Sequence, residues 1–152
     1  MIINRGLTQT LTQINAEESK LLYSELSYKI RGACFELRKE LGWGHKEVIY
    51  QRGLEQKLIQ LGLNCDRERQ LPVKVDGKKV GVYIPDLVVE EKIMIEIKAK
   101  EFVNKYDITQ FWQYLRISSF KLGFLINFGS QKDLEIIRRV YDTARFRIVQ
   151  RV

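Results

Sequence analysis

Apolar side chains in the first third of the chain recur with the period of an α-helix. Within residues 22–41 they fall at Leu22, Leu26, Ile30, Ala33, Cys34, Leu37 and Leu41. This spacing places them on one face of a helix, which Gly42-Trp43-Gly44 ends. A second helix is predicted from about Lys46 to Leu61, because Gly62 follows its last periodic residue.

Beyond Gly62 the apolar residues form short runs or alternate with polar ones, as is typical of strands. The Asp76-Gly77 pair is a hairpin signal, and Glu90-Glu91-Lys92 joins two further runs. The predicted elements are strands at 70–75, 80–89 and 93–99, a helix at 105–118, a buried strand at 121–128, a helix at 131–141 and an edge strand at 146–149. The core order α-α-β-β-β-α-β predicts an α/β fold, a mixed β-sheet flanked by helices.

The chain of 152 residues has the length of one domain. We expect residues 1–20 to be a polar N-terminal tail and residues 21–152 to form the single domain. No apolar run approaches the roughly 18 residues that a membrane span needs, and the N-terminus lacks the pattern of a secretory signal. A cytoplasmic location without membrane contact is therefore expected, with Cys34 and Cys65 as free thiols.

The balance of charge favours a polyanionic partner. There are 26 Lys and Arg residues against 19 Asp and Glu, a net charge of +7, which suits nucleic acid. A solvated surface of mixed charge explains the composition equally well. Arginines gather near the C-terminal end, where they either contact phosphates or remain solvated: Arg138, Arg139, Arg145, Arg147 and Arg151.

Three residues of the predicted hairpin at 80–99 are candidates for chemistry. Glu96 and Lys98 share one face of their strand, because side chains alternate across a strand. If residues 90–92 form a three-residue loop, Val89 pairs with Ile93 and Asp86 falls opposite Glu96. A two-residue loop would place Asp86 opposite Ile97 and the cluster would not form.

Two facing carboxylates and an ammonium among apolar strands are costly unless they are paired or bind a metal. A Mg²⁺ ion relieves this cost, since it prefers oxygen ligands and commonly uses one or two carboxylates together with substrate phosphate. The alternative is a cross-strand Asp–Lys or Glu–Lys salt bridge on a half-exposed sheet, a common arrangement that contributes little stability.

Several further motifs occur in a fixed order around these residues. They are Glu40-Leu41-Gly42-Trp43, Gly44-His45-Lys46-Glu47-Val48-Ile49-Tyr50, Gln70-Leu71-Pro72-Val73, Val80-Gly81-Val82-Tyr83, Asp86-Leu87-Val88-Val89-Glu90, Ile95-Glu96-Ile97-Lys98-Ala99 and Leu125-Ile126-Asn127-Phe128. Over residues 26–130 the chain resembles the GxxExxY family, small bacterial proteins assigned to the PD-(D/E)xK nuclease superfamily. The usual family loop reads Gly-Pro-Gly, whereas here Trp43 replaces the proline.

The resemblance implies a restriction-endonuclease-like core and a role for each matched residue. Asp86, Glu96 and the Ile97 carbonyl would bind the metal, and Lys98 would be the catalytic lysine. Glu47 would be the additional acidic residue that some members bring to the metal.

The resemblance also assigns a pattern on the helix that follows the core strands. Gln110 and Tyr114 match a Q-x-x-x-Y pattern found there in exonuclease-like branches, and their i, i+4 spacing puts them on one helical face. Simpler explanations exist for these outer residues. Glu47 favours the helix dipole in any case, and Gln113 offers a competing register to Gln110.

The resulting hypothesis is a Mg²⁺- or Mn²⁺-dependent nuclease that acts on DNA or RNA, with DNA favoured. A homodimer is one arrangement that would cut both strands. The alternative is a catalytically inactive module with a nuclease-like fold that binds nucleic acid or protein. A third option is a chain that acts only inside a larger complex.

Overall fold

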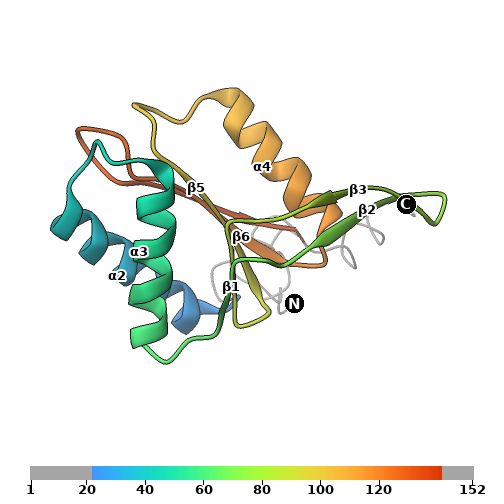
Figure 1. Ribbon diagram of the computed structural model, residues 1–152, viewed down its shortest axis with the longest axis horizontal. Coiled ribbons are helices and arrows are strands. Elements are labelled where there is room, and N and C mark those ends of the chain that lie inside the picture. Colours follow the sequence, from blue (N-terminus) through green and yellow to red (C-terminus); the bar gives the residue numbers. More distant parts are fainter. Residues whose placement is uncertain (1–21, 142–152) are drawn as a thin grey trace, which may run out of the picture.

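A five-stranded mixed sheet forms the centre of the computed structural model, which describes residues 22–141 (Figure 1). Its strands, in spatial order, are β1 (Cys65–Asp66), β4 (Leu87–Val89), β5 (Ile93–Lys98), β6 (Leu122–Asn127) and β7 (Glu135–Val140). The β5–β6 pair is parallel and the other three pairs are antiparallel. The predicted tail at 1–20, the predicted strand at 146–149 and Arg145, Arg147 and Arg151 lie outside the described residues.

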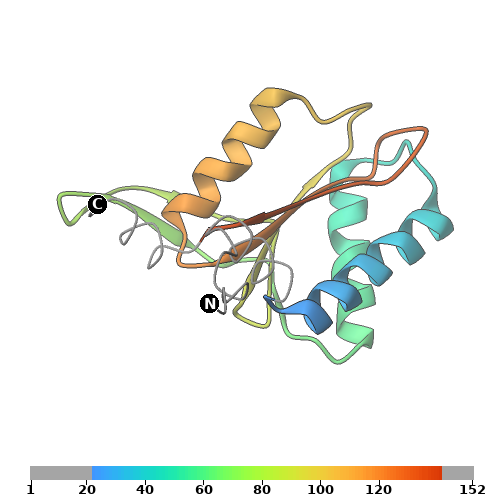
Figure 2. The same ribbon diagram turned by 180° about the vertical axis from the view of Figure 1, so that it is seen from behind.

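Helices cover both faces of this sheet (Figures 1 and 2). The helices α2 (Ser24–Leu41) and α3 (Glu47–Gln60) pack on one face, where Ile93, Ile95 and Ile97 of β5 are buried against them. The helix α4 (Lys105–Ile117) packs on the other face, against Met94. Since Glu96 and Lys98 alternate with the isoleucines, they share the α4 face with Met94.

Helix α4 also makes the crossover between the parallel strands β5 and β6. It begins with a capping box, in which Asn104 and Asp107 exchange side-chain to backbone hydrogen bonds of 2.9 and 3.1 Å. No helix within residues 22–141 is long and apolar enough to cross a membrane. Cys34 and Cys65 are free thiols, as predicted.

A second, two-stranded sheet extends from the body of the protein (Figures 1 and 2). It consists of β2 (Leu71–Val75) and β3 (Lys78–Tyr83), and we refer to residues 71–83 as the β2–β3 arm. Its turn is Asp76-Gly77, where both residues have positive φ angles, 50° and 78°. This matches the hairpin turn predicted from the sequence.

The prediction of a single strand at 80–89 was wrong. The chain leaves the arm after Tyr83, bends through Ile84-Pro85-Asp86 and enters the central sheet as β4. Pro85 explains the break, because its ring fixes φ and it has no N–H for a ladder hydrogen bond. Residues 80–89 look like one strand in the sequence, but they belong to two different sheets.

The predicted helix at 131–141 was also wrong, since Glu135–Val140 forms β7. Its apolar residues alternate between the two faces: Ile136 and Val140 pack with the α2–α3 core, whereas Ile137 packs with the α4 core. Antiparallel pairing covers the edge of β6 that would otherwise be open. Burial on both faces therefore outweighs the local helical pattern.

Gly129 allows the segment after β6 to approach the end of β5 closely. An added Cβ there would lie 2.5 Å from the carbonyl carbon of Ala99 and 2.6 Å from the carbonyl oxygen of Lys100. Because these are backbone atoms, we expect Gly129→Ala to lower the free energy of unfolding by about 3 kcal/mol. Urea denaturation measures this change.

Gly32→Ala is the matched control, because a Cβ on this α2 residue would meet nothing within 4 Å. It is expected to raise the free energy of unfolding by about 1 kcal/mol, since alanine favours a helix interior. Equal denaturation midpoints for the two variants would contradict the close approach.

Candidate active site

The β4–β5 hairpin brings Asp86 and Glu96 side by side. Leu87 pairs with Ile95 and Val89 with Ile93, so the loop has three residues and the next pair along is Asp86 and Glu96. The backbone N–H of Asp86 donates to Oε1 of Glu96 at 3.3 Å. The register condition derived from the sequence is therefore met.

Two donors fix the carboxylate of Asp86. The backbone N–H of Ile97 donates to Oδ2 at 2.7 Å, and Nε2 of Gln51 donates to Oδ1 at 2.9 Å. Because β4 begins only at Leu87, Ile97 has no strand partner on that edge and bonds the side chain instead. Gln51 belongs to α3, so the helix is tied directly to the hairpin.

Glu96 is held by a residue of the β2–β3 arm. The hydroxyl of Tyr83 donates to Oε1 of Glu96. The ring of Tyr83 stacks on that of Tyr114 in α4, with centroids 3.7 Å apart and planes 13° apart. The arm, the central sheet and α4 therefore meet at this one carboxylate.

Both carboxyl groups are easier to protonate than ordinary ones. Burial is the main cause that raises the pKa of Asp86, and the charge of Glu47 adds to it. Burial also raises the pKa of Glu96, followed by the charge of Asp86. Burial and the charge of Glu96 raise the pKa of Tyr83, so its hydroxyl stays protonated and donates. A pair of this kind favours a bound cation over two free negative charges.

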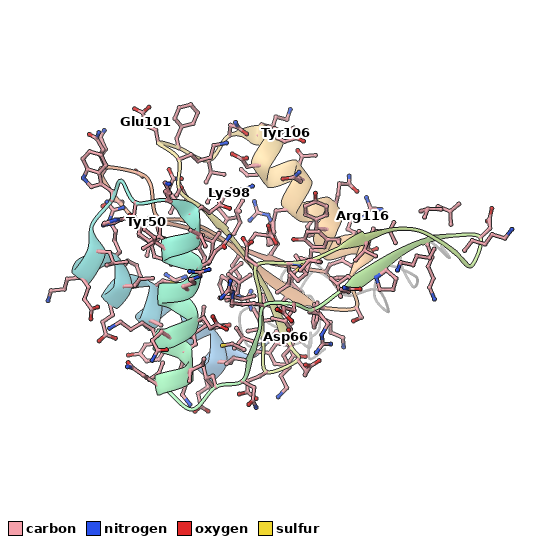
Figure 3. The ribbon with its side chains drawn as sticks, viewed as in Figure 1. Tyr50, Asp66, Lys98, Glu101, Tyr106 and Arg116 are labelled. Carbon is pink, nitrogen blue, oxygen red and sulfur yellow. The ribbon has the colours of Figure 1, made fainter. Side chains whose placement is uncertain are left out.

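Lys98 is the last residue of β5 and is half-buried, with α3 on one side and α4 on the other (Figure 3). Its charge lowers the pKa of both Asp86 and Glu96. Within residues 22–141, however, the salt bridges do not include Lys98. The cross-strand salt bridge considered as an alternative from the sequence is thus not formed.

The donor atoms at this position fit a small hard cation. Among the described residues no three His, Cys, Asp or Glu side chains cluster as a metal site, so the acidic pair is the side-chain contribution. The carbonyl of Lys98 faces β6, where it accepts from the N–H of Phe128 at 2.9 Å. Since successive residues face opposite edges of a strand, the Ile97 carbonyl faces the Asp86 side. Two carboxylates and a carbonyl suit Mg²⁺, which keeps several waters and takes further oxygens from phosphate.

The remaining predicted residues lie at different places around the pair. Glu47, the first residue of α3, is exposed; it acts on Asp86 through its charge and accepts from Nε2 of Gln51 at 3.4 Å. Tyr114 stacks on Tyr83, whose hydroxyl donates to Glu96. Gln110 lies one turn before Tyr114, half-buried, and makes no hydrogen bond with another side chain in the described part of the chain.

Arg138 and Arg139 do not join this group. They lie on β7, two strands from β5, which corresponds to about 10 Å across the sheet. Arg138 is half-buried and donates to the carbonyl of Leu22 at 3.1 Å, and burial lowers its pKa. Arg139 is exposed and donates to the carbonyl of Arg138 at 3.0 Å. A contact of these arginines with nucleic acid stays a prediction.

Sequence reasoning assigned no role to Gln51 and Tyr83. Gln51 lies four residues after Glu47 on α3, so helical spacing alone would have placed it on the same face. Tyr83 stands three residues before Asp86, beyond the proline bend. Nothing in the spacing indicates that its hydroxyl turns back to Glu96.

The family model described as the PD-(D/E)XK nuclease superfamily matches residues 24–140. The chain belongs to the PD-(D/E)XK nuclease superfamily. The match spans every helix and strand of the described residues, from the start of α2 to the end of β7. It agrees with the predicted restriction-endonuclease-like fold. Neither the curated proteins nor the solved structures include a match. The narrower GxxExxY assignment stays a prediction.

Proposed function

We propose that this PD-(D/E)XK chain is a divalent-metal-dependent nuclease that hydrolyses phosphodiester bonds in DNA, with RNA as the less favoured substrate. The observation that carries the proposal is the paired Asp86 and Glu96, each fixed by hydrogen-bond donors, with the ammonium of Lys98 close by. An inactive binding module would gain nothing from clustered carboxylates, since they repel phosphate.

Each residue would have a distinct task. Asp86, Glu96 and the Ile97 carbonyl would hold Mg²⁺ or Mn²⁺, with Glu47 as the outer acidic residue. The bound ion would polarise the phosphodiester and lower the pKa of a water molecule. Lys98 would position the attacking water and stabilise the charge that develops on the phosphate.

The helix α4 would complete the site. Tyr114 supports the ring of Tyr83, which in turn holds Glu96. Gln110, one turn earlier on the same face, would contact the sugar–phosphate backbone of the substrate.

A cleavage assay tests this function. The full chain is incubated with single- and double-stranded DNA and RNA in Mg²⁺, in Mn²⁺ and in EDTA. Cleavage of at least one DNA form is expected with either metal and none in EDTA. If no substrate is cut and calorimetry detects no metal binding, the nuclease proposal fails. Sedimentation in the same buffers measures whether the active form is a homodimer.

Tyr83→Phe is expected to weaken Mn²⁺ binding by about 10-fold or more. The substitution keeps the ring that stacks on Tyr114 but removes the hydroxyl that donates to Glu96. Groups that orient a metal ligand typically contribute 10- to 100-fold in metal affinity. Isothermal titration calorimetry measures the change.

Tyr106→Phe provides the matched control. Tyr106 lies in the first turn of α4 with an exposed ring (Figure 3). The Tyr106→Phe variant should therefore bind Mn²⁺ like the wild type. Equal Mn²⁺ affinity for Tyr83→Phe and the wild type would show that Glu96 needs no support from the arm.

A further inference from the structure

The β2–β3 arm is exposed to solvent along most of its length. Every residue from 74 to 80 is exposed, and the arm forms its own sheet beside the body of the protein (Figures 1 and 2). Two-stranded hairpins are marginally stable by themselves. Within residues 22–141 it is anchored at its base, by buried Leu71 and by Tyr83.

The arm carries an arrangement of charge that is unfavourable in the free protein. Lys74 and Lys79 are direct cross-strand partners. Like charges in these positions destabilise a sheet. Lys78 lies next to them at the turn, and Asp76 is the single acidic residue of the arm. The salt bridges of the described residues include none of the three lysines.

A β-bulge creates this lysine pair. Val73 pairs with Gly81, so a regular ladder would place Lys74 opposite Val80. The register instead shifts between Val73 and Lys74, and Lys74 faces Lys79. Bulges re-aim side chains in this way. The hairpin thus gathers positive charge at a point where no described acidic residue forms a salt bridge with it.

The base of the arm is part of the candidate active site. Tyr83 is the last residue of β3, donates to Glu96 and stacks on Tyr114. Lys79 lies four residues earlier on the same strand, which corresponds to about 13 Å of extended chain. Along B-DNA this distance is about four base pairs. A duplex whose phosphate lies at Asp86 and Glu96 therefore has the length to reach the lysines.

We propose that the β2–β3 arm binds the sugar–phosphate backbone of duplex DNA about four base pairs from the phosphate that reacts. This proposal rests on the proposed nuclease function and names its substrate class. A two-stranded β-ribbon has the width that the major groove of B-DNA admits, whereas the major groove of an A-form RNA helix is too narrow.

The apolar residues beside the lysines fit the same partner. Val80 and Val82 are 64% and 42% exposed, and apolar side chains contact sugars and thymine methyl groups in the groove. A second copy of the chain is a poorer occupant, because edge-to-edge pairing of two arms would bring further lysines together.

The test measures binding, so it does not depend on catalysis. Fluorescence anisotropy follows binding of the full chain to a labelled 30-base-pair DNA duplex in EDTA over a series of salt concentrations. The triple variant Lys74→Gln, Lys78→Gln, Lys79→Gln should bind roughly tenfold more weakly or worse. The slope of log K against log salt should fall in magnitude by about 0.9 for each lysine that contacts a phosphate.

Two further variants control for charge and folding. Lys39→Gln, Lys92→Gln, Lys121→Gln removes three exposed lysines outside the arm, of which Lys92 and Lys121 precede β5 and β6 at the end of the sheet opposite Lys98. This variant should keep most of the affinity and slope. Replacing the three arm lysines with arginine keeps the charge and should restore binding. Circular dichroism of each variant checks the fold.

The proposal is overturned if the arm and control variants bind the duplex equally, or if single-stranded DNA or duplex RNA shows the same dependence on the arm. Loss of self-association by the arm variant with unchanged DNA affinity would also overturn it, in favour of a second copy. If binding depends on the arm lysines but the wild type cleaves no substrate, the nuclease function is refuted and the role of the arm in binding stands. If the wild type cleaves DNA and the triple variant binds the duplex as tightly as the wild type, the role of the arm is refuted and the nuclease function stands.

Discussion

Lys98→Ala is expected to reduce the rate constant for phosphodiester cleavage by about two to three orders of magnitude, the usual loss when one preorganised donor to a developing negative charge is removed. Lys98 is half-buried and close enough to lower the pKa of both Asp86 and Glu96. It is nevertheless not engaged in a salt bridge with any described residue. Its ammonium is therefore available to a water molecule or a phosphate oxygen.

Single-turnover cleavage at saturating Mg²⁺ measures this loss, because it separates chemistry from product release. Lys105→Ala is the matched control: this exposed lysine begins α4, the next helix after β5, and its removal takes away the same charge. The control should retain most of the rate. If both variants lose the rate equally, Lys98 acts only through the general positive field and not at the reacting phosphate.

Calorimetry with Mn²⁺ distinguishes a role in chemistry from a role in assembling the site. Lys98→Ala is expected to bind Mn²⁺ within a few-fold of the wild type, because the lysine donates to none of the proposed ligands. A loss of metal affinity in proportion to the loss of rate would assign Lys98 to the support of Asp86 and Glu96 instead.

The fold was predictable where a local pattern and a tertiary environment agree. The apolar stripes of α2 and α3 face the sheet, and the Asp76-Gly77 turn closes the arm. The prediction failed where the environment changes within a continuous pattern. Residues 80–89 have the apolar-rich composition of one strand, yet Pro85 divides them between two sheets. Residues 131–141 were predicted to be helical, yet Glu135–Val140 pairs with the edge of β6 as a strand.

The candidate site followed the same division. The spacing of Asp86, Glu96 and Lys98 predicted the cluster on the condition that residues 90–92 form a three-residue loop, and the observed register meets that condition. The partners that fix the carboxylates come from other elements. Gln51 reaches Asp86 across 35 positions of sequence, and Tyr83 reaches Glu96 across 13. Such contacts depend on how α3 and the arm pack, which no local pattern reveals.

Glu96→Gln is expected to stabilise the protein without metal and to abolish its stabilisation by metal. Burial and the neighbouring Asp86 both disfavour the charge of Glu96. The glutamine keeps an oxygen that accepts from Tyr83 and from the N–H of Asp86, but it removes the charge. An increase of about 1 kcal/mol in the free energy of unfolding is expected in EDTA, as is usual when a functional site is relieved of strain.

The pH dependence of this stability has a definite sign. Because the folded pKa values of Asp86 and Glu96 are raised, the folded protein retains protons that the unfolded chain has released. Their contribution to stability is present below the ordinary carboxyl pKa of about 4 and is lost as the pH rises through the folded values. Without metal, the wild type should lose this contribution with rising pH, and Glu96→Gln should lose less of it.

A bound metal ion should make the wild type more stable than Glu96→Gln, the reverse of their order in EDTA. At a hundredfold excess over its dissociation constant, an ion that binds only the folded wild type adds about 2.7 kcal/mol to the free energy of unfolding. Glu96→Gln lacks one of the two carboxylates and should gain little, whereas Glu101→Gln, which changes an exposed residue three positions after Lys98, should respond like the wild type (Figure 3). Thermal melts in EDTA and in Mn²⁺ measure both effects. If Glu96→Gln is less stable than the wild type in EDTA and gains equally from Mn²⁺, the carboxylate is a structural group and the metal lies elsewhere.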